Sequence, residues 1–398
     1  MTRRIYLDNN ATTRVDPEVV QAMLPYFTER FGNASSKHDL GEDAATAVRA
    51  ARRQVRELLG ATSSDEIVFT SGGSESDNTA LLAALETQNG RDEIITSQVE
   101  HPAILALCEH LEKAGRASVH RIPVDEAGRL DSRAYRRALS SKVACVSFMW
   151  ANNETGAMFP IAQLAEMAHE VGALFHTDAV QAAGKVPMQV RETQIDMLSL
   201  SAHKFHGPKG IGALYVRNGV KVAPLIRGGR QERGRRAGTE NVPAIVGLGK
   251  AAELARHRLE SEMPRVRDLR DRLEAGLLAR IGSALVLGDP GNRLPNTVNI
   301  AFEHLESDPI LLLLNRRGIA ASSGSACASG SMEPSHVLRA MQVPYTYAFG
   351  AVRFSLSREN TAEDVDAVID ATAATVAKLR DDACTDAVDG RLLVESYT

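Results

Sequence analysis

The sequence predicts an α/β fold built around a mostly parallel β-sheet, followed by a smaller α+β domain. Between residues 16 and 250, short apolar runs alternate with segments of helical periodicity. Nearly continuous apolar runs are typical of parallel strands covered on both faces, and intervening helices supply the crossover connections that such strands require. After residue 254 the pattern changes to one long amphipathic segment followed by isolated strand-like runs, which indicates a second domain.

The elements of the first domain follow from this alternation. Asp16 and Pro17 predict the start of a helix over 18–28, because Asp caps helix N-termini and Pro is favoured in the first turn. The expected strands are 66–70, 93–96, 143–150, 173–176, 196–200 and 212–216, and the expected helices between them are 76–86, 103–114 and 161–171.

The elements of the second domain are fewer. A long helix is expected to begin near residue 254, because apolar side chains recur from there to Ile281 at steps of three to five residues. Strands are expected at 297–302 and 352–356. A last helix is expected over 361–380, with Thr361 as its N-cap and Asp364 at its third position.

These elements divide the chain into three parts. Residues 16–255 form the expected large domain. Residues 1–15 and 256–380 form the expected small domain, which brings the first segment of the chain together with the elements that follow the long helix. Residues 381–398 form a C-terminal tail, and we expect weak order over the last 15 residues because chain ends are often loosely held.

Composition excludes several classes of protein. The 398 residues carry 46 basic and 50 acidic side chains, a net charge of −4, which gives no reason to expect a nucleic-acid partner. The longest apolar runs are too short to cross a bilayer, and the first residues contain no apolar signal segment. The four cysteines form no CxxC pair, which argues against a disulfide framework or a four-thiolate metal site. We therefore expect a cytoplasmic protein.

Five of the expected strands are each followed by a cluster of polar residues. In open α/β sheets, ligands bind outside the carboxyl ends of the strands, so these clusters are expected to converge on one crevice. They are Ser-Gly-Gly-Ser-Glu-Ser at 71–76, Glu-His-Pro at 100–102, Asn-Asn-Glu at 152–154, His-Thr-Asp-Ala-Val-Gln at 176–181 and Ser-Ala-His-Lys at 201–204.

Three of these clusters together match the needs of pyridoxal phosphate. The 71–76 turn can point backbone N–H groups and a helix N-terminus at an anion, although it is not a nucleotide P-loop. Asp178 can pair with a protonated ring nitrogen, and a buried Lys204 can form an imine. Each has an ordinary alternative: a plain tight turn, a structural salt bridge and a lysine that reaches solvent. His101 can likewise stack on a ring or be a hydrogen-bonded structural residue.

One of the four cysteines stands in an unusual setting. Cys327 lies in the run Ser-Ser-Gly-Ser-Ala-Cys-Ala-Ser-Gly-Ser at 322–331, where no bulky neighbour can pack around it. Cys108 and Cys145 lie instead among the apolar residues of an expected helix and strand, as structural cysteines do. Cys327 can therefore act as a nucleophile on a Gly/Ser-rich loop, or stand by chance in a linker.

The sequence resembles the cysteine desulfurases, which are fold-type I pyridoxal-phosphate enzymes, over nearly its full length. The matching segments are 6–13, 69–76, 100–102, 152–154, 178–181, 201–204, 233–240, 322–331 and 353–356. Two stretches, 149–156 and 231–241, look most like the nitrogenase-associated NifS type rather than the housekeeping IscS type. The resemblance implies a class V aminotransferase-like fold, with a mostly parallel seven-stranded sheet in the large domain and a smaller α+β domain.

The resemblance implies roles in catalysis and substrate binding. Lys204 would bind the cofactor covalently and later move the Cα proton of the substrate, while His101 would stack on the pyridine ring and serve in acid–base steps. Asn153 and Arg353 would bind the substrate carboxylate, a task that suits a bidentate guanidinium. Cys327 would attack the sulfur of bound L-cysteine, which leaves L-alanine and a persulfide on Cys327.

The same resemblance implies a binding site for pyridoxal 5′-phosphate and no metal site. Asp178 would pair with the ring nitrogen, Gln181 would hydrogen-bond the phenolic oxygen, and Thr239 would reach the phosphate from the second subunit of a homodimer. The residues expected to bind the cofactor are Gly73, Ser74, Asn153, Asp178, Gln181, Ser201, His203, Lys204 and Thr239. The persulfide sulfur would pass to an iron–sulfur scaffold protein of the NifU type, in the context of nitrogen fixation.

Two positions depart from the family pattern. Ser74 replaces the more usual Thr and keeps its hydroxyl, so little loss is expected. Arg230 stands where relatives often place His, and its role stays open.

Three other functions are compatible with parts of the pattern. Another fold-type I activity, such as an aminotransferase or β-lyase, would make Cys327 incidental and would require a keto-acid acceptor. A metal-dependent hydrolase would use His176, Asp178, His203 and His206, since His and Asp are common metal ligands. A non-catalytic sulfur carrier would leave the five polar clusters without a purpose.

Overall fold

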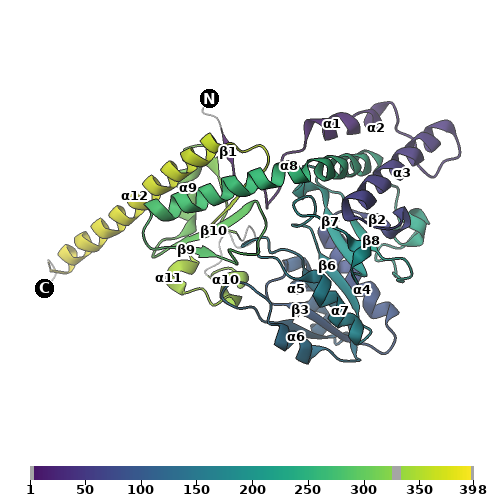
Figure 1. The fold of residues 1–398 in the computed structure, drawn as a ribbon, viewed down its shortest axis with the longest axis horizontal. Coiled ribbons are helices and arrows are strands. Elements are labelled where there is room, and N and C mark those ends of the chain that lie inside the picture. The colour runs from purple at the N-terminus through teal and green to yellow at the C-terminus, as the bar shows by residue number, and fades with distance from the viewer. Residues whose placement is uncertain (1–3, 325–332, 396–398) are drawn as a thin grey trace.

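A seven-stranded sheet forms the centre of the molecule (Figure 1). The computed structural model describes residues 4–324 and 333–395, with side chains up to residue 382. The strands of the sheet are, in spatial order, β2 (Ile67–Thr70), β8 (Gly212–Val216), β7 (Met197–Ser201), β6 (Leu174–Asp178), β5 (Val143–Met149), β3 (Glu93–Ser97) and β4 (Ser118–Ile122). Neighbours from β7 to β4 run parallel, whereas β8 runs antiparallel to β2 and β7. The predicted fold class is confirmed.

The six expected strands all occur, within two residues of the expected bounds. Every residue of β5 and β7 is buried, which explains why these strands appear in the sequence as continuous apolar runs. The sequence pattern does not reveal β4, because this strand lies at the edge of the sheet and most of its residues are partly exposed.

Helices cover both faces of the sheet. Successive strand residues point to opposite faces, so Ile94 and Cys145 belong to one apolar cluster while Ile95 and Val146 belong to another. The first cluster contains buried residues of α4 (Gly73–Thr87) and α5 (Pro102–Lys113). The second contains buried residues of α3 (Asp39–Leu59), α6 (Ser132–Ala138), α7 (Ile161–Glu170) and α8 (Val242–Arg280).

The expected helix over 18–28 is two helices, α1 (Pro17–Met23) and α2 (Pro25–Thr28). Asp16 caps α1 as predicted, because its Oδ1 accepts the backbone N–H of Glu18 at 2.8 Å. Pro25 has no N–H to continue the hydrogen-bond ladder, so the first helix ends before it.

The long helix α8 begins at Val242 rather than near residue 254. Its first three turns are buried on most sides, for example at Ile245, Leu248 and Ala252, so no amphipathic stripe marks them in the sequence. Gly249 lies against α3 so closely that a Cβ there would lie 2.5 Å from the Cα of Ala51. Figure 1 shows α8 continuing from this core to the second sheet.

The rest of the chain is built around a smaller antiparallel sheet. Its strands are, in order, β12 (Ala351–Ser355), β10 (Thr297–Phe302) and β9 (Ala284–Leu287). A parallel pair, β1 (Ile5–Tyr6) and β11 (Ile319–Ala320), brings the start of the chain to this part. The accompanying helices are α9 (Ser307–Arg316), α10 (His336–Ala340), α11 (Tyr345–Ala348) and α12 (Ala362–Glu395). Leu7 and Val266 join the strands in a separate apolar cluster.

The last helix confirms the predicted start and corrects the predicted end. Thr361 and Asp364 form a reciprocal cap: the backbone N–H of Asp364 donates to Thr361 Oγ1, and that of Thr361 donates to Asp364 Oδ2. The helix continues to Glu395 instead of ending at residue 380, since no proline interrupts the following segment. Its C-terminal end extends away from the body of the molecule (Figure 1).

A buried ion pair fixes the segment that precedes α8. Arg52 of α3 donates to both carboxylate oxygens of Glu232, at 2.6 and 2.7 Å, and Glu232 also accepts the backbone N–H of Phe69 at 3.0 Å. Glu232 and Arg233 both have left-handed backbone, with φ of 46° and 57°. Because such backbone is costly for residues with a side chain, the ion pair must hold this turn in place.

Within the described ranges, no helix combines the length and the apolar character that crossing a lipid bilayer requires.

Removal of the Glu232 carboxylate is expected to destabilise the fold strongly. Glu232→Ala leaves a buried guanidinium without its partner, which costs about 3 kcal/mol or more of unfolding free energy. The matched control is Arg272→Ala, which breaks an ion pair with Asp366 whose two side chains are about half exposed and should cost less than about 1 kcal/mol. Urea unfolding of the three proteins measures both values. Equal losses in the two variants would contradict the anchoring role.

Candidate active site

A pocket of about 190 Å³ lies at the carboxyl ends of the parallel strands. Most of the residues predicted for the site meet in it, although they are spread over 130 positions of the sequence. Its lining is Gly73, Ser74, Asp77, His101, Met149, Ala151, Asn153, Asp178, Val180, Gln181, Ser201, His203 and Lys204. The predicted convergence of the strand-end clusters is therefore observed.

Lys204 lies in a single helical turn directly after β7, with its amine buried in the pocket. The Nζ atom donates to two backbone carbonyls of the N-terminal segment, those of Asn10 at 2.6 Å and Ala11 at 2.9 Å. Burial, and then the nearby charge of Arg353, lower the pKa of Lys204 to about 8. With this pKa about a tenth of the amine is uncharged at pH 7, far more than for an ordinary lysine, and this fraction is able to act as a nucleophile.

His101 is held by the helix that follows it. Its Nδ1 accepts the backbone N–H of Ala103 at 3.1 Å, so the ring serves as the N-cap of α5. Burial lowers the pKa of His101. The neutral ring then carries its proton on Nε2, the nitrogen left free by the cap.

Asp178 is the last residue of β6 and points into the pocket. One of its oxygens accepts the backbone N–H of Val180 at 2.9 Å. Burial raises the pKa of Asp178, and the neighbouring carboxyls Asp77 and Glu100 have raised pKa values for the same reason, that of Glu100 reaching about 8. A cation bound beside Asp178 would restore its ionised form.

The N-terminus of α4 faces the same pocket through Gly73 and Ser74. No side chain caps this end among the described residues, so its first N–H groups are available to an anion. Gly73 packs against Val180 so tightly that a Cβ would lie 2.7 Å from the Val180 side chain. Ser201 and His203 stand nearby in the pocket lining, and burial lowers the pKa of His203 to about 4.

Asn10 is not among the residues predicted for the site, although it contacts several of them. Its backbone carbonyl accepts from Gln181 Nε2 at 2.9 Å as well as from Lys204. Its side chain donates to the carbonyl of Asn153 at 3.2 Å and to Thr297 Oγ1 at 2.8 Å, which joins the large sheet to the small one. Asn10 belongs to the matching segment 6–13, yet nothing in its spacing indicates this role.

Arg353 is buried just outside the pocket lining. Its guanidinium donates to the carbonyls of Asn153 at 2.8 Å and Gly324 at 3.1 Å, and to Asp8 Oδ1 at 2.8 Å. The Nε atom has no acceptor among the described residues. The structure thus places Arg353 beside Asn153, with one buried donor still unused.

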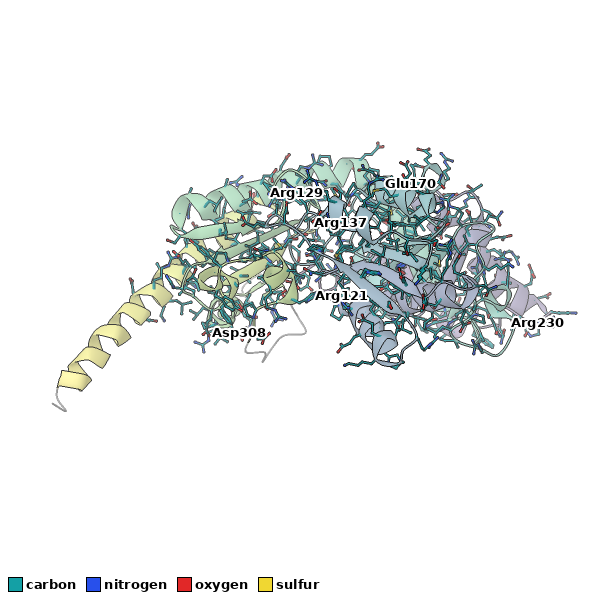
Figure 2. All side chains as sticks on the ribbon, turned by 90° about the horizontal axis from the view of Figure 1, so that it is seen from below. Arg121, Arg129, Arg137, Glu170, Arg230 and Asp308 are labelled. Atoms are coloured by element: carbon teal, nitrogen blue, oxygen red, sulfur yellow. The ribbon has the colours of Figure 1, made fainter. Side chains whose placement is uncertain are left out.

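Thr239 does not line this pocket. It lines a separate pocket of about 260 Å³ on the surface next to β2, together with Ser71 and Arg236. Arg236 pairs with Glu75 of α4, at 2.9 Å between Nε and Oε1, which holds the Thr239 segment near the N-terminus of that helix. Arg230 is exposed and lies at the end of the molecule opposite α12 (Figure 2).

Cys327 lies outside the described residues, but both flanks of its loop contact the site. On one side, Gly324 accepts from Arg353; on the other, the Ser335 hydroxyl donates to Glu154 at 2.6 Å. Cys108 and Cys145 are fully buried, and burial raises the pKa of both thiols, that of Cys108 to about 12.

The residues proposed for a metal site do not converge. Both ring nitrogens of His176 are occupied by hydroxyl groups, Ser147 at 2.8 Å and Ser199 at 2.9 Å. His206 lines a different, smaller cavity behind Lys204. Across the described ranges, no three His, Cys, Asp or Glu side chains form a group able to hold a metal ion.

Comparisons with known proteins agree with this geometry. The sequence model of the class-V aminotransferase family matches residues 5–368. A cysteine desulfurase of Gluconacetobacter diazotrophicus is 68% identical over 377 residues, which cover 95% of this chain and 94% of that protein. The cysteine desulfurase NifS of Azotobacter vinelandii is 59% identical over 376 residues, covering 94% and 93%. A solved NifS-like protein superposes with a TM-score of 0.88 at 37% identity, covering 94% of this chain and all of that one.

The chain belongs to the class-V aminotransferase family. Its high identity to proteins named cysteine desulfurase, NifS among them, confirms the family predicted from the motifs. Enzymes of this family depend on pyridoxal 5′-phosphate, which is therefore the cofactor of this chain.

The lowered pKa of Lys204 predicts the pH dependence of cofactor attachment. Only the neutral amine forms the covalent link, so the attachment rate to the cofactor-free protein should rise with pH to a midpoint near 8, rather than near the ordinary lysine value of 10.5. Asp8→Asn removes a carboxylate that raises this pKa and should move the midpoint lower. Stopped-flow absorbance at several pH values measures the rate. A midpoint near 10.5 in both proteins would contradict the burial argument.

Proposed function

We propose that this protein is a pyridoxal-phosphate-dependent cysteine desulfurase, which converts L-cysteine to L-alanine and holds the sulfur as a persulfide on Cys327. The observation that carries the proposal is one pocket in which the buried amine of Lys204 and the buried carboxyl of Asp178 stand beside the uncapped end of α4. The amine of Lys204 can form a covalent link, whereas among the described residues Asp178 lacks a cationic partner and the N-terminus of α4 lacks an anion. Pyridoxal phosphate would supply a partner for each of the three groups.

The residues present fit that cofactor. The uncapped helix end with Ser74, Ser201 and His203 supplies donors for its phosphate. Asp178, whose pKa burial raises, gains a cationic partner in the ring nitrogen. When bound, the cofactor withdraws electrons from the substrate Cα and makes its proton acidic.

The chain's own residues then handle the proton and the substrate. Lys204 accepts the Cα proton, because its pKa near 8 suits a base working close to neutral pH. His101 is neutral, and its hydrogen bond with the backbone of Ala103 fixes the ring. It would stack on the pyridine ring of the cofactor and serve in acid–base steps through its Nε2 proton. Asn153 and Arg353 bind the substrate carboxylate, for which the unused Nε of Arg353 is a donor.

Cys327 accepts the sulfur. Its thiolate attacks the sulfur of the bound substrate, an S–S bond forms, and the Cβ–S bond of the substrate breaks with its electron pair left on carbon. Protonation of that carbon, and return to Cα of the proton that Lys204 accepted, give L-alanine, so L-cysteine and one thiol yield L-alanine and one persulfide. The contacts of Gly324 with Arg353 and of Ser335 with Glu154 support this role, because they hold both flanks of the loop beside the site.

The cofactor site is completed by a second copy of the chain. Thr239 lines a pocket apart from the one that holds Lys204, which supports the proposal that it reaches the phosphate from a partner subunit. An apolar patch supports the homodimer: Leu24, Phe27 and Phe31 are 49%, 60% and 65% exposed around α2.

The persulfide would serve iron–sulfur cluster assembly in the cytoplasm, with a scaffold protein of the NifU type as acceptor. The identity to NifS of Azotobacter vinelandii supports this assignment and a link to nitrogen fixation. The separate apolar cluster around the small sheet, whose members all lie in 1–15 or 256–380, supports the division into a cofactor domain at 16–255 and a second domain at 1–15 and 256–380 that carries the Cys327 loop, with a tail at 381–398.

Two substitutions separate the steps of the reaction. Lys204→Ala should abolish covalent cofactor attachment and alanine formation, whereas Cys327→Ala should keep the yellow cofactor and lower sulfur transfer by about 10³-fold or more, as expected for loss of a nucleophile. Cys108→Ala is the control and should transfer sulfur normally, since its buried thiol is not ionised. Alanine and sulfide are measured with and without a keto acid. Undiminished transfer by Cys327→Ala, or dependence on the keto acid, would contradict the proposal.

The apolar patch predicts the effect of a charge in the dimer interface. Phe31→Glu places a carboxylate at the patch and should shift sedimentation from dimer towards monomer and weaken cofactor retention, because the partner's phosphate contact is lost. Leu312→Glu is the control, since Leu312 is 53% exposed on α9, away from α2. A monomeric wild-type protein that retains cofactor would overturn the shared site.

A further inference from the structure

Lys185 is a buried lysine that the proposed reaction does not use. Its side chain is 7% exposed, and it stands four residues after Gln181. The Nζ atom donates to Gln181 Oε1 at 2.9 Å and to Asn10 Oδ1 at 3.2 Å. Within the described chain it makes no ion pair, so both of its contacts are to neutral amide oxygens. Burial and the cations Lys204 and Arg353 lower its pKa well below the ordinary value.

The partners of Gln181 determine which way its amide points. The protonated amine of Lys185 can only donate, and the backbone carbonyl of Asn10 can only accept. Gln181 therefore turns Oε1 to Lys185 and Nε2 to the Asn10 carbonyl, at 2.9 Å. The reversed amide would place donor against donor and acceptor against acceptor in a buried site, which costs both hydrogen bonds.

This orientation decides what the pocket offers to a ligand. Nε2 carries two hydrogens, and Asn10 takes one of them. The second N–H remains for a group bound in the pocket, which Gln181 lines. If the amide were reversed, Gln181 would present an acceptor and would repel an anionic oxygen.

We propose that Lys185 is a positioning residue that orients the Gln181 amide so that an N–H faces the phenolic oxygen of the cofactor. The inference rests on the proposed role of Gln181 and assigns the group that maintains it. Lys185 touches neither substrate nor cofactor in this account, and it acts through Gln181 alone.

A second explanation must be separated from this one. Lys185 lies close enough to Lys204 for each charge to influence the other. A direct charge effect on Lys204 would change the cofactor site whether or not residue 181 carries an amide. An orienting effect requires that amide.

A double-mutant cycle distinguishes the two explanations. Lys185→Met, Gln181→Met and the double variant are loaded with pyridoxal phosphate, and two quantities are measured: its dissociation constant, and the pH midpoint of the visible absorption change. Lys185→Met and Gln181→Met should each weaken binding about 10-fold, the scale of one hydrogen bond to a charged group, and raise the midpoint, because the phenolate loses its donor. The double variant should show no further change.

The controls make each outcome decisive. Lys250→Met removes a lysine of α8 that pairs with Glu18 and Glu253 outside the pocket and should change neither quantity. Gln181→Glu keeps the oxygen that faces Lys185 but replaces the N–H by a second acceptor, so it should also weaken binding, and it serves if Lys185→Met fails to fold.

Three results would overturn the inference. The first is wild-type binding by Lys185→Met. The second is an equal effect of Lys185→Met with and without Gln181→Met, which would show a charge effect. The third is wild-type binding by Gln181→Glu. A wild-type chain that binds no pyridoxal phosphate would overturn the proposed function itself before any variant is compared.

Discussion

The site depends on one constraint: the amine of Lys204 is buried between two backbone carbonyls of the N-terminal segment. Lys204 follows a strand of the large sheet, whereas Asn10 and Ala11 come from a segment that leads out of the small part of the molecule. The N-terminal segment therefore lies directly against the amine of Lys204 and contributes to its burial. Because burial lowers the pKa of Lys204, this contact prepares the amine for its chemistry before any ligand arrives.

The other ionisable groups in and around the pocket are also buried. Among the described residues, Asp178, Asp77 and Glu100 are buried without an ion pair to a lysine or arginine, and burial raises the pKa of each. Within the same ranges, Lys204 and Lys185 donate only to neutral oxygens. Buried ionisable groups without opposite charges are costly in a folded protein, and they occur where a bound ligand completes the electrostatics. A zwitterionic cofactor with a cationic ring nitrogen and an anionic phosphate would supply both the positive and the negative charge that these buried groups lack as partners.

The sheet and most of the pocket could be predicted because buried parallel strands leave continuous apolar runs, and the polar residues after each run must meet at one edge. Asn10 could not be predicted, because it contacts Gln181 and Lys204 more than 170 positions further along the chain. Lys185 follows Gln181 by four residues, but nothing in the sequence indicates that its amine is buried. The start of α8 was misplaced for a related reason: a helix buried on most sides has no amphipathic stripe. Arg353 and Thr239 were recognised through the family resemblance alone, and the structure places both outside the pocket lining.

The most direct test of the central claim is to reduce the cofactor-loaded protein with borohydride and to identify the modified lysine by peptide mass spectrometry. Reduction fixes the cofactor on whichever amine has formed the covalent link. The account predicts a single modified peptide, the one that contains Lys204, since this amine alone combines a place in the pocket lining with a pKa near 8. A label on Lys185 or Lys209, or an unlabelled Lys204 peptide in a fully loaded sample, would contradict it.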